Sequence, residues 1–306
     1  MKLGRPDLAE YADRFRVPKE SPDSAVTVTF LGVATLLIDD GLSAILTDGF
    51  FSRPRLRRVL TRSISPDPEM IRRCLDRVGV LQLDAVVPVH SHYDHAFDSA
   101  VVAELTGAKL VGGRSTLNIG RGHGLPDDML LRPAPGVTFD VGNFSITMIE
   151  SRHCPPDRAP GEIEGPLQPP AKAKAYRCGE AWSILIDHPD LQSGMLVQGS
   201  AGFVEGALAD VGTDVVYLGI GQLGRRPRSE IVAYWNETVR AVGARRAVVI
   251  HWDDFFRPIT EPLRANPYAA DDLGATLRVL DPLAEADGVD LVFPAVWERA
   301  DPWAGL

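Results

Sequence analysis

The stretch HSHYDHAFD, residues 90–98, places three histidines and two aspartates directly after an apolar run. His90 and His92 stand two residues apart, and Asp94 and His95 follow at once. Neutral imidazole nitrogens and a carboxylate are the donors that Zn²⁺, Fe²⁺ or Mn²⁺ need at a site that stays open to water. Scattered surface histidines rarely repeat this spacing by chance, so the pattern predicts a metal site.

Two more histidines occur in the same setting, each just past a β-type run. FSITMIES precedes His153, and ARRAVVI precedes His251. We expect both to converge with the first group in one coordination sphere or in two adjoining ones. His123 and His188 stand in turn-like contexts, where a surface role is the simpler expectation.

The elements that must position these residues are short. AVTVTFLG, ATLLIDD and LSAILTDG are β-type runs, with a hairpin turn at residues 39–41. LDAVVPV is a continuous apolar run, typical of a strand covered on both faces, and it ends at His90. A loop is expected over residues 52–67, which are rich in arginine and proline, and then a helix over PEMIRRCLDRVG.

The second half of the chain also mixes β-type runs with helical segments. Strands are expected near GVTFDVGNFSITMIES, AWSILIDHP, GMLVQG and TDVVYLGI, followed by the helix RSEIVAYWNETVRAVG and the strand RRAVVIHW. We therefore expect the α/β class, as a four-layer αββα sandwich of two mixed β-sheets flanked by helices, in one domain over residues 1–306. The Pro/Gly-rich segment around residues 155–175 is expected to be a mobile, lid-like insertion over the metal site.

The overall charge narrows the class of function. The chain has 41 acidic and 32 basic residues and a formal charge of −9, which argues against a general nucleic-acid-binding surface. Neither a signal peptide nor a transmembrane segment is expected from the apolar runs. Three cysteines without a C-x-x-C pair fit reduced thiols and a cytoplasmic location. The sequence does not specify an oligomeric state.

HSHYDH resembles the His-x-His-x-Asp-His signature of the metallo-β-lactamase-fold metal-dependent hydrolase superfamily, and the likeness extends over most of the chain. The resemblance implies a first metal site of His90, His92 and His153 and a second of Asp94, His95 and His251. It also implies that Asp48, in LTDGF, supports the site without binding metal. FLGVATLLID, ILTDGFFSRP and VVIHWDDFF look most like the branch that contains ascorbate-phosphate lactonase and a phospholipase D acting on N-acyl phospholipids.

One position departs from that family. GMLVQGSAGF stands where the family usually carries a bridging aspartate, and the resemblance puts Ser200 there; Asp187 or Asp214 would substitute under another alignment. With Asp94 as the single carboxylate, two divalent ions keep more uncompensated positive charge than they would beside a second, bridging carboxylate. We therefore expect one tightly bound ion and a weaker second. Zinc is the first expectation, with manganese and iron as alternatives.

Further polar residues have two interpretations each. Asp98, one helical turn after His95, accepts a hydrogen bond from a ligand imidazole or is a first-turn acid of a helix. Five arginines between Arg53 and Arg62, with Lys172, Lys174 and Arg177, are either anion-binding groups or a solvated basic surface.

Together these observations predict a metal-dependent hydrolase. In it a metal-bound hydroxide attacks a lactone, another ester or a phosphodiester, and Asp94 is the catalytic residue that orients or deprotonates the water. The expected partner is a small-molecule substrate, which is anionic if the basic residues bind anions and undetermined in charge if they form a solvated surface. The alternative is a non-hydrolytic metal protein of the same fold, either an iron-dependent redox member or a scaffold that lost turnover.

Overall fold

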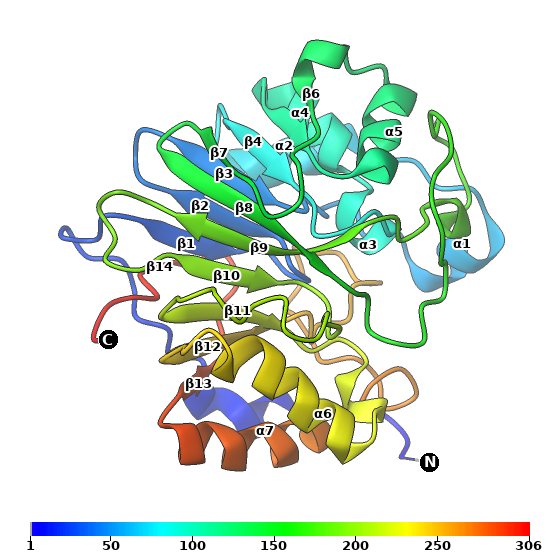
Figure 1. Cartoon of the computed structure of the whole chain (residues 1–306). Coiled ribbons are helices and arrows are strands. Elements are labelled where there is room, and N and C mark those ends of the chain that lie inside the picture. The colour runs from blue at the N-terminus through cyan, green and yellow to red at the C-terminus, as the bar shows by residue number, and fades with distance from the viewer. Residues whose placement is uncertain (1) are drawn as a thin grey trace.

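Two β-sheets pack face to face, and helices cover the outer face of each (Figure 1). This computed structural model describes residues 2–306. The αββα sandwich of two mixed sheets that the sequence predicts is confirmed. No helix in residues 2–306 is both long and apolar enough to cross a membrane.

The first sheet mixes antiparallel and parallel pairs. Its seven strands lie in the order β14 (Arg299–Ala300), β1 (Thr27–Phe30), β2 (Leu36–Asp39), β3 (Ala44–Thr47), β4 (Ala85–Val87), β5 (Lys109–Val111) and β6 (Leu130–Leu131). Pairs from β14 to β3 are antiparallel, and pairs from β3 to β6 are parallel. The predicted hairpin turn at residues 39–41 joins β2 to β3.

The second sheet has the same plan. Its seven strands lie in the order β13 (Asp290–Val292), β12 (Arg246–Ile250), β11 (Val215–Gly219), β10 (Met195–Gln198), β9 (Ala181–Asp187), β8 (Phe144–Ser151) and β7 (Thr138–Val141). Pairs from β7 to β10 are antiparallel, and pairs from β10 to β13 are parallel.

Helices lie outside both sheets. The α-helices are α1 (Leu56–Thr61), α2 (Pro68–Arg77), α3 (Tyr93–Ala96), α4 (Ser99–Thr106), α5 (Arg114–His123), α6 (Arg228–Trp235) and α7 (Leu273–Asp287). The 3₁₀-helices are η1 (Leu8–Arg14), η2 (Asp127–Met129), η3 (Ala173–Ala175) and η4 (Leu223–Arg225). The π-helical η5 (Asn236–Arg240) continues α6. Helices α6 and α7 pack side by side against the second sheet (Figure 1).

Helix α1 was not expected, because its segment shows no hydrophobic period. Its LRRVLT sequence contains good helix formers, and a backbone bond from Val59 N to Arg55 O, of 3.1 Å, closes its first turn. None of its residues is buried. The expected loop is therefore an exposed helix of six residues.

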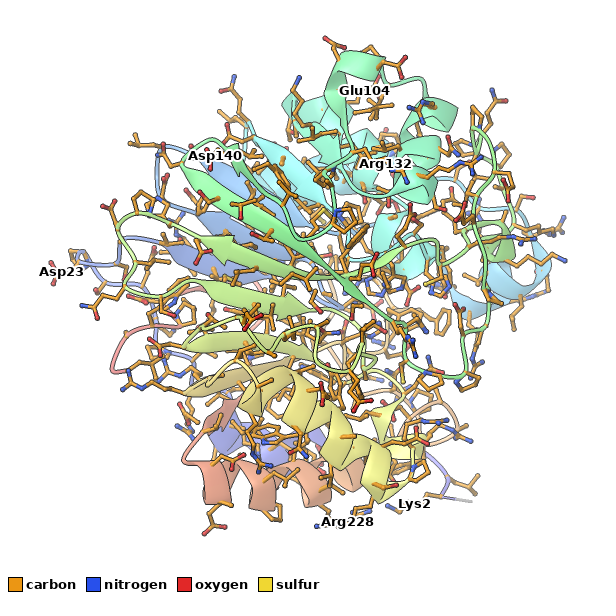
Figure 2. The ribbon with its side chains drawn as sticks, viewed as in Figure 1. Lys2, Asp23, Glu104, Arg132, Asp140 and Arg228 are labelled. Carbon is orange, nitrogen blue, oxygen red and sulfur yellow. The ribbon has the colours of Figure 1, made fainter. Side chains whose placement is uncertain are left out.

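Alternation along the strands divides the core into two layers. Ile45 on β3 and Val87 on β4 face the space between the sheets, whereas Leu46 and Val86 face the helices outside the first sheet. Charged side chains such as Asp140, Glu104 and Arg228 lie on the outside of the molecule (Figure 2). Burial of both sheet faces explains why the central strands are apolar throughout.

Parallel pairing brings several strand ends to one edge. Thr47 on β3 lies opposite Val87 on β4, so the residues that follow these strands emerge together. In the second sheet Gly219 on β11 lies opposite Ile250 on β12, directly before His251. Segments far apart in sequence thus deliver their polar side chains to the same place.

Candidate metal centre

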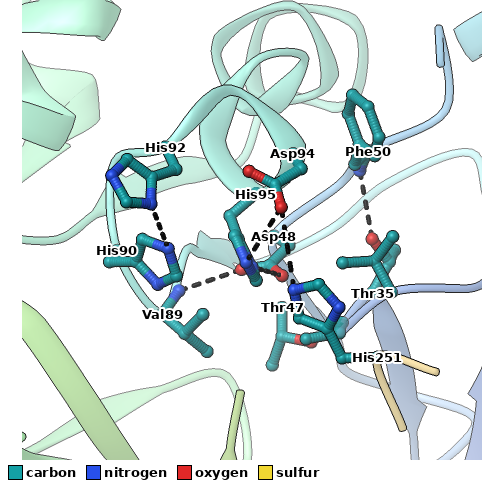
Figure 3. A network of polar contacts seen from close by, with 12 residues as sticks. Thr35, Thr47, Asp48, Phe50, Val89, His90, His92, Asp94, His95 and His251 are labelled. Carbon is teal, nitrogen blue, oxygen red and sulfur yellow. Dashed lines mark hydrogen bonds and ion pairs between the residues drawn. The ribbon is translucent and has the colours of Figure 1, made fainter. Parts of the chain in front are cut away.

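The structure brings together all six residues that the sequence singles out as metal donors. One donor atom each from His90, His92 and His153 lies within 4.8 Å of the other two, and the same holds for Asp94, His95 and His251. We call these sets the first and the second triad. Figure 3 shows His90 and His92 on one side of His95, and Asp94 and His251 on the other.

The turn after β4 separates the two triads. His92 is extended and precedes α3, and its carbonyl oxygen accepts the backbone N–H groups of His95 at 3.0 Å and Ala96 at 2.8 Å. This single turn of helix reverses the chain between His92 and His95. Neighbouring residues of the motif therefore serve different triads.

In the first triad the three rings meet edge to face, with interplanar angles of 85°, 81° and 79°. Nε2 of His90 lies 3.1 Å from Nδ1 of His92. Nδ1 of His153 donates to the carbonyl oxygen of Cys154 at 2.6 Å, which leaves Nε2 of His153 with a free lone pair. Nε2 of His90 and Nδ1 of His92 are close enough for their lone pairs to bind one cation.

The second triad gathers around one carboxylate. Oδ2 of Asp94 lies 3.8 Å from Nε2 of His95 and 3.7 Å from Nε2 of His251. Nδ1 of His95 donates to Oδ2 of Asp48 at 2.6 Å, and Oδ1 of Asp48 accepts the backbone N–H of Val89 at 2.9 Å. Asp48 thus supports His95 from behind, as the resemblance implies.

Burial keeps the rings of His90, His95 and His153 uncharged near neutral pH. It lowers the pKa of His90 and of His95 well below the usual value, with a further contribution from the neighbouring imidazoles, and lowers the pKa of His153 to about 4. Nε2 of His95 is buried and has no hydrogen-bond partner among the described residues 2–306. A divalent cation would satisfy this orphaned nitrogen, so the donor set fits a metal ion.

Backbone strain marks the second triad and the residue that supports it. Asp48 has φ 56° and His251 has φ 58°, the left-handed region that non-glycine residues seldom adopt. The N–H of His251 donates to the carbonyl oxygen of Val33 at 2.8 Å, which holds the strained turn. A Cβ at Gly221 would lie 2.8 Å from Nδ1 of His251, so glycine there leaves room for the ring.

Ser200 follows β10 and lines the same cavity as His153 and His251. Its hydroxyl oxygen accepts the backbone N–H of Cys154 at 3.0 Å. A neutral hydroxyl therefore faces the site at this place. The correspondence of Ser200 with the family's bridging aspartate stays a prediction.

Asp98 has a different role from the imidazole partner considered for it. Its carboxylate accepts the backbone N–H groups of Phe51 at 2.7 Å and Ser52 at 2.6 Å, and the Ser52 hydroxyl at 2.7 Å. Asp98 also stands at the N-cap of α4 without a side-chain capping bond. It therefore fixes the loop that follows Asp48.

Two expectations about surface residues are wrong. Arg53 is fully buried and donates to Oδ2 of Asp253 at 2.8 Å, so it does not bind anions at the surface. His188 is buried as well, and its Nε2 lies 2.9 Å from Oδ2 of Asp40. Both residues tie together segments that are distant in sequence. His123 is half-buried at the end of α5.

A cavity of about 560 Å³ opens beside the triads. Its lining contains His92, Asp94, His153 and His251, together with an apolar group, a cationic group and other polar side chains. The apolar group is Leu56, Val59, Leu60, Phe255 and Phe256, and the cationic group is Arg158, Lys172 and Lys174. Gln222, Asn266 and Asp271 complete the polar wall.

Sequence inspection missed several of these residues. Arg158 and its neighbour Asp157 lie four or five positions after His153, and Phe255 and Phe256 lie equally close to His251. Proximity to a predicted ligand was the available signal. Gln222 has no such neighbour, and only its positive φ of 68° distinguishes it.

The segment around residues 155–175 contributes Arg158, Ala159 and residues 172–174 to the cavity lining. It is also anchored more firmly than its composition predicts. Ile163 is buried, and its N–H donates to the Ser115 hydroxyl on α5 at 3.0 Å. Ala171 forms a bridge with Ile64, with N···O distances of 2.8 and 3.0 Å. Its mobility remains a prediction.

Comparison with known proteins agrees with this geometry. Residues 28–169 match the family described as the metallo-beta-lactamase superfamily. The matched region contains the first triad and ends before Ser200 and His251, so the place of those two residues rests on the structure.

A curated relative of this chain is described as a UPF0173 metal-dependent hydrolase, from Myxococcus xanthus. The two are 27% identical over 139 residues, which is 45% of this chain and 43% of the relative. The chain therefore spans less than half the length of the relative that it matches.

Solved structures share the fold over nearly the whole chain. The metallo hydrolase Igni18 from Ignicoccus hospitalis is 15% identical, with a TM-score of 0.52 over 90% of this chain and 97% of that one. YhfI from Bacillus subtilis, a metallo-beta-lactamase fold protein, is 13% identical, with a TM-score of 0.50 over 89% and 98%. CmlA from Streptomyces venezuelae, a diiron beta-hydroxylase, is 13% identical, with a TM-score of 0.53 over 92% and 54%.

Proposed function

We propose that this chain is a metal-dependent hydrolase that cleaves an ester, lactone or phosphodiester bond in a small anionic molecule. The observation that carries the proposal is the opening of two donor triads onto one cavity of about 560 Å³. The name of the Myxococcus xanthus relative and the superfamily match support it. We propose zinc as the ion because histidines dominate the donor set, with manganese or iron as alternatives.

The chemistry is divided between the ion and the chain. A bound divalent ion supplies a Lewis acid and lowers the pKa of a coordinated water toward neutrality. The side chain of Asp94 is 15% exposed, so its carboxylate is accessible from the cavity, where it can orient the attacking water and accept its proton. Asp48 holds the His95 ring in a fixed direction.

The cavity lining indicates the substrate. Arg158, Lys172 and Lys174 are exposed, and within residues 2–306 no carboxylate lies at ion-pair distance from them. Lys172 donates to the carbonyl oxygen of Thr61 at 3.3 Å, and a carbonyl group leaves its charge uncompensated. In a chain of formal charge −9, uncompensated cations at the cavity favour an anionic substrate. The lining also carries Leu56, Leu60 and two phenylalanines, which suit an apolar substituent.

The non-hydrolytic alternative has weaker support. The diiron hydroxylase shares 13% of its residues with this chain, which shows a common fold and nothing of its reaction. We also propose a cytoplasmic location, because Cys74, Cys154 and Cys178 are buried free thiols, which fit a reducing compartment.

A substrate panel tests the proposal. The chain is stripped with a chelator, reloaded with Zn²⁺, Mn²⁺ or Fe²⁺, and assayed on aryl esters, lactones and phosphodiesters with anionic or neutral substituents. Turnover should need metal, favour anionic members and be lost in His90→Ala. A reloaded protein that cleaves no member of the panel, or one that holds paired iron with a visible absorption band and no hydrolysis, would overturn it.

A further inference from the structure

The loop that follows His153 returns to another ring of the first triad. Nε2 of His92 donates to the carbonyl oxygen of Ala159 at 3.3 Å and lies 3.2 Å from Oδ1 of Asp157. Because a carbonyl oxygen only accepts, the ring proton stands on Nε2. Nδ1 of His92 therefore keeps its lone pair, and it points toward His90.

Asp157 also builds the turn that presents this carbonyl group. Its Oδ1 accepts the backbone N–H of Ala159 at 2.8 Å. The carbonyl oxygen of Ala159 in turn accepts the N–H of Cys178 at 2.9 Å. The side chain of Asp157 is 23% exposed and that of His92 is 9% exposed, so the pair lies largely out of water. A charge contact in such a place is weakly screened.

In His92, His95 and His153, the ring nitrogen that points away from the triad has a hydrogen-bond acceptor beside it. His95 has the Asp48 carboxylate behind it, and His153 has a backbone carbonyl. His92 has a carbonyl and a carboxylate, and both come from the Pro/Gly-rich loop instead of the sheet that carries the motif. The direction of His92 therefore depends on the conformation of that loop.

A different use of Asp157 has less support. Donor atoms of His92, Asp157 and Cys178 also lie within 4.8 Å of one another, as a third possible metal group. Burial raises the pKa of the Cys178 thiol far above its usual value, with a further contribution from Asp157. The thiol stays protonated near neutral pH and is a poor ligand in that form.

We propose that Asp157 is a positioning residue of the first triad. Its carboxylate holds His92 with Nδ1 directed at the metal position and offsets the positive charge that the ring gains on coordination. The loop is thereby a part of the metal centre as well as a wall of the cavity. The proposal rests on metal binding as described under the proposed function, and not on hydrolysis.

Two substitutions separate the charge of Asp157 from its turn. Asp157→Asn keeps an oxygen that accepts the Ala159 N–H and removes the charge, whereas Asp157→Ala removes both. The affinity for one equivalent of Zn²⁺ is measured by competition with a chromophoric chelator, and the geometry by the d–d absorption of the Co²⁺ form. We expect Asp157→Asn to bind Zn²⁺ about 10-fold or more weakly and to alter the Co²⁺ spectrum.

Glu162→Gln is the matched control, because it removes one carboxylate from the same loop. Glu162 pairs with Arg114 at 3.3 Å on the surface. The control should bind Zn²⁺ as the parent chain does, and thermal unfolding of the metal-free proteins should show that all three variants are folded. Parent-like affinity and spectrum in Asp157→Asn would overturn the proposal, as would equal losses in Asp157→Asn and Glu162→Gln.

The outcome is independent of turnover. Weak Zn²⁺ binding by Asp157→Asn, in a parent chain that hydrolyses nothing, would support the positioning role and reject the hydrolase. If Asp157→Asn binds Zn²⁺ normally and the parent chain hydrolyses esters, the positioning role is rejected and the hydrolase is supported.

Discussion

Oδ2 of Asp48 lies 2.6 Å from Nδ1 of His95, and both side chains are fully buried. The contact fixes which nitrogen of His95 carries its proton and leaves Nε2 facing Asp94. Because Asp48 follows β3 and His95 follows β4, this contact also joins two neighbouring strand ends. It is the link between the first sheet and the second triad.

Asp48→Asn should lower the metal occupancy of the second triad and leave the first triad loaded. Asparagine tolerates the positive φ and keeps an acceptor for the Val89 N–H, but its amide donates to His95 and moves the ring proton to Nε2. A loss of about 10- to 100-fold in affinity is expected. Metal analysis after dialysis measures it, with Asp84→Asn, away from the triads, as the control.

Ser200→Asp should raise the metal content toward two ions per chain. The change adds a negative charge beside both triads, a favourable Coulomb term of about 4 kcal/mol at 4 Å and an effective dielectric of about 20, before desolvation is subtracted. Ser200→Asn has a similar shape without the charge and should leave the content unchanged. Two tightly held ions in the parent protein would contradict the expectation.

Lys172→Glu with Lys174→Glu should raise KM for anionic substrates by about tenfold and change kcat little, since exposed ion pairs contribute about 0.2–1 kcal/mol each. Added salt should reduce the difference. Steady-state kinetics with an anionic and a neutral ester measure it. Lys109→Glu, on β5 and outside the cavity lining, is the control, and an equal effect on the neutral ester would contradict the prediction.

Burial raises the pKa of Asp98 to about 7, although the hydrogen bonds from Ser52 and Phe51 oppose the shift. The folded state therefore binds a proton that the unfolded chain releases near pH 4. Stability from this group is complete below pH 4 and is lost as the pH rises through 7. Relative to Asp98→Asn, the free energy of unfolding of the parent should fall by at most about 1.4 kcal/mol per pH unit over that window.

Urea unfolding of metal-free protein at pH 5, 6 and 7 measures the Asp98 effect. The unfolding free energy of the parent minus that of Asp98→Asn should fall as the pH rises. A difference that is constant over this range would show that Asp98 is ionised throughout.

Local patterns were sufficient to predict most of the fold. Strands with apolar runs and a hairpin turn at residues 39–41 fix their own structure, because backbone pairing and burial act on neighbouring residues. Strand β4 and the His90–His95 motif follow from the same short stretch. The gathering of polar residues after buried strands then made the location of the site predictable.

Contacts between distant residues could not be predicted in this way. Arg53 lies within a basic stretch that suggests solvent exposure, and its partner Asp253 is 200 residues away. His188 likewise reaches Asp40 across 148 residues. Charged residues are rarely buried without a partner, and a sequence does not show which partner the fold supplies. Asp157 lies close to His153 in sequence, but its contact with His92, 65 residues earlier, is likewise set by the fold.

The division of donors between the sheets has a consequence during synthesis. His90 to His95 leave the ribosome first, His153 comes next, and His251 is made roughly a hundred residues later, which takes roughly 5–20 s at 5–20 residues per second. The first triad has all its donors during that interval, whereas the second cannot close. A nascent chain that captures a cation would therefore hold it at the three histidines, and translation itself would decide which position fills first.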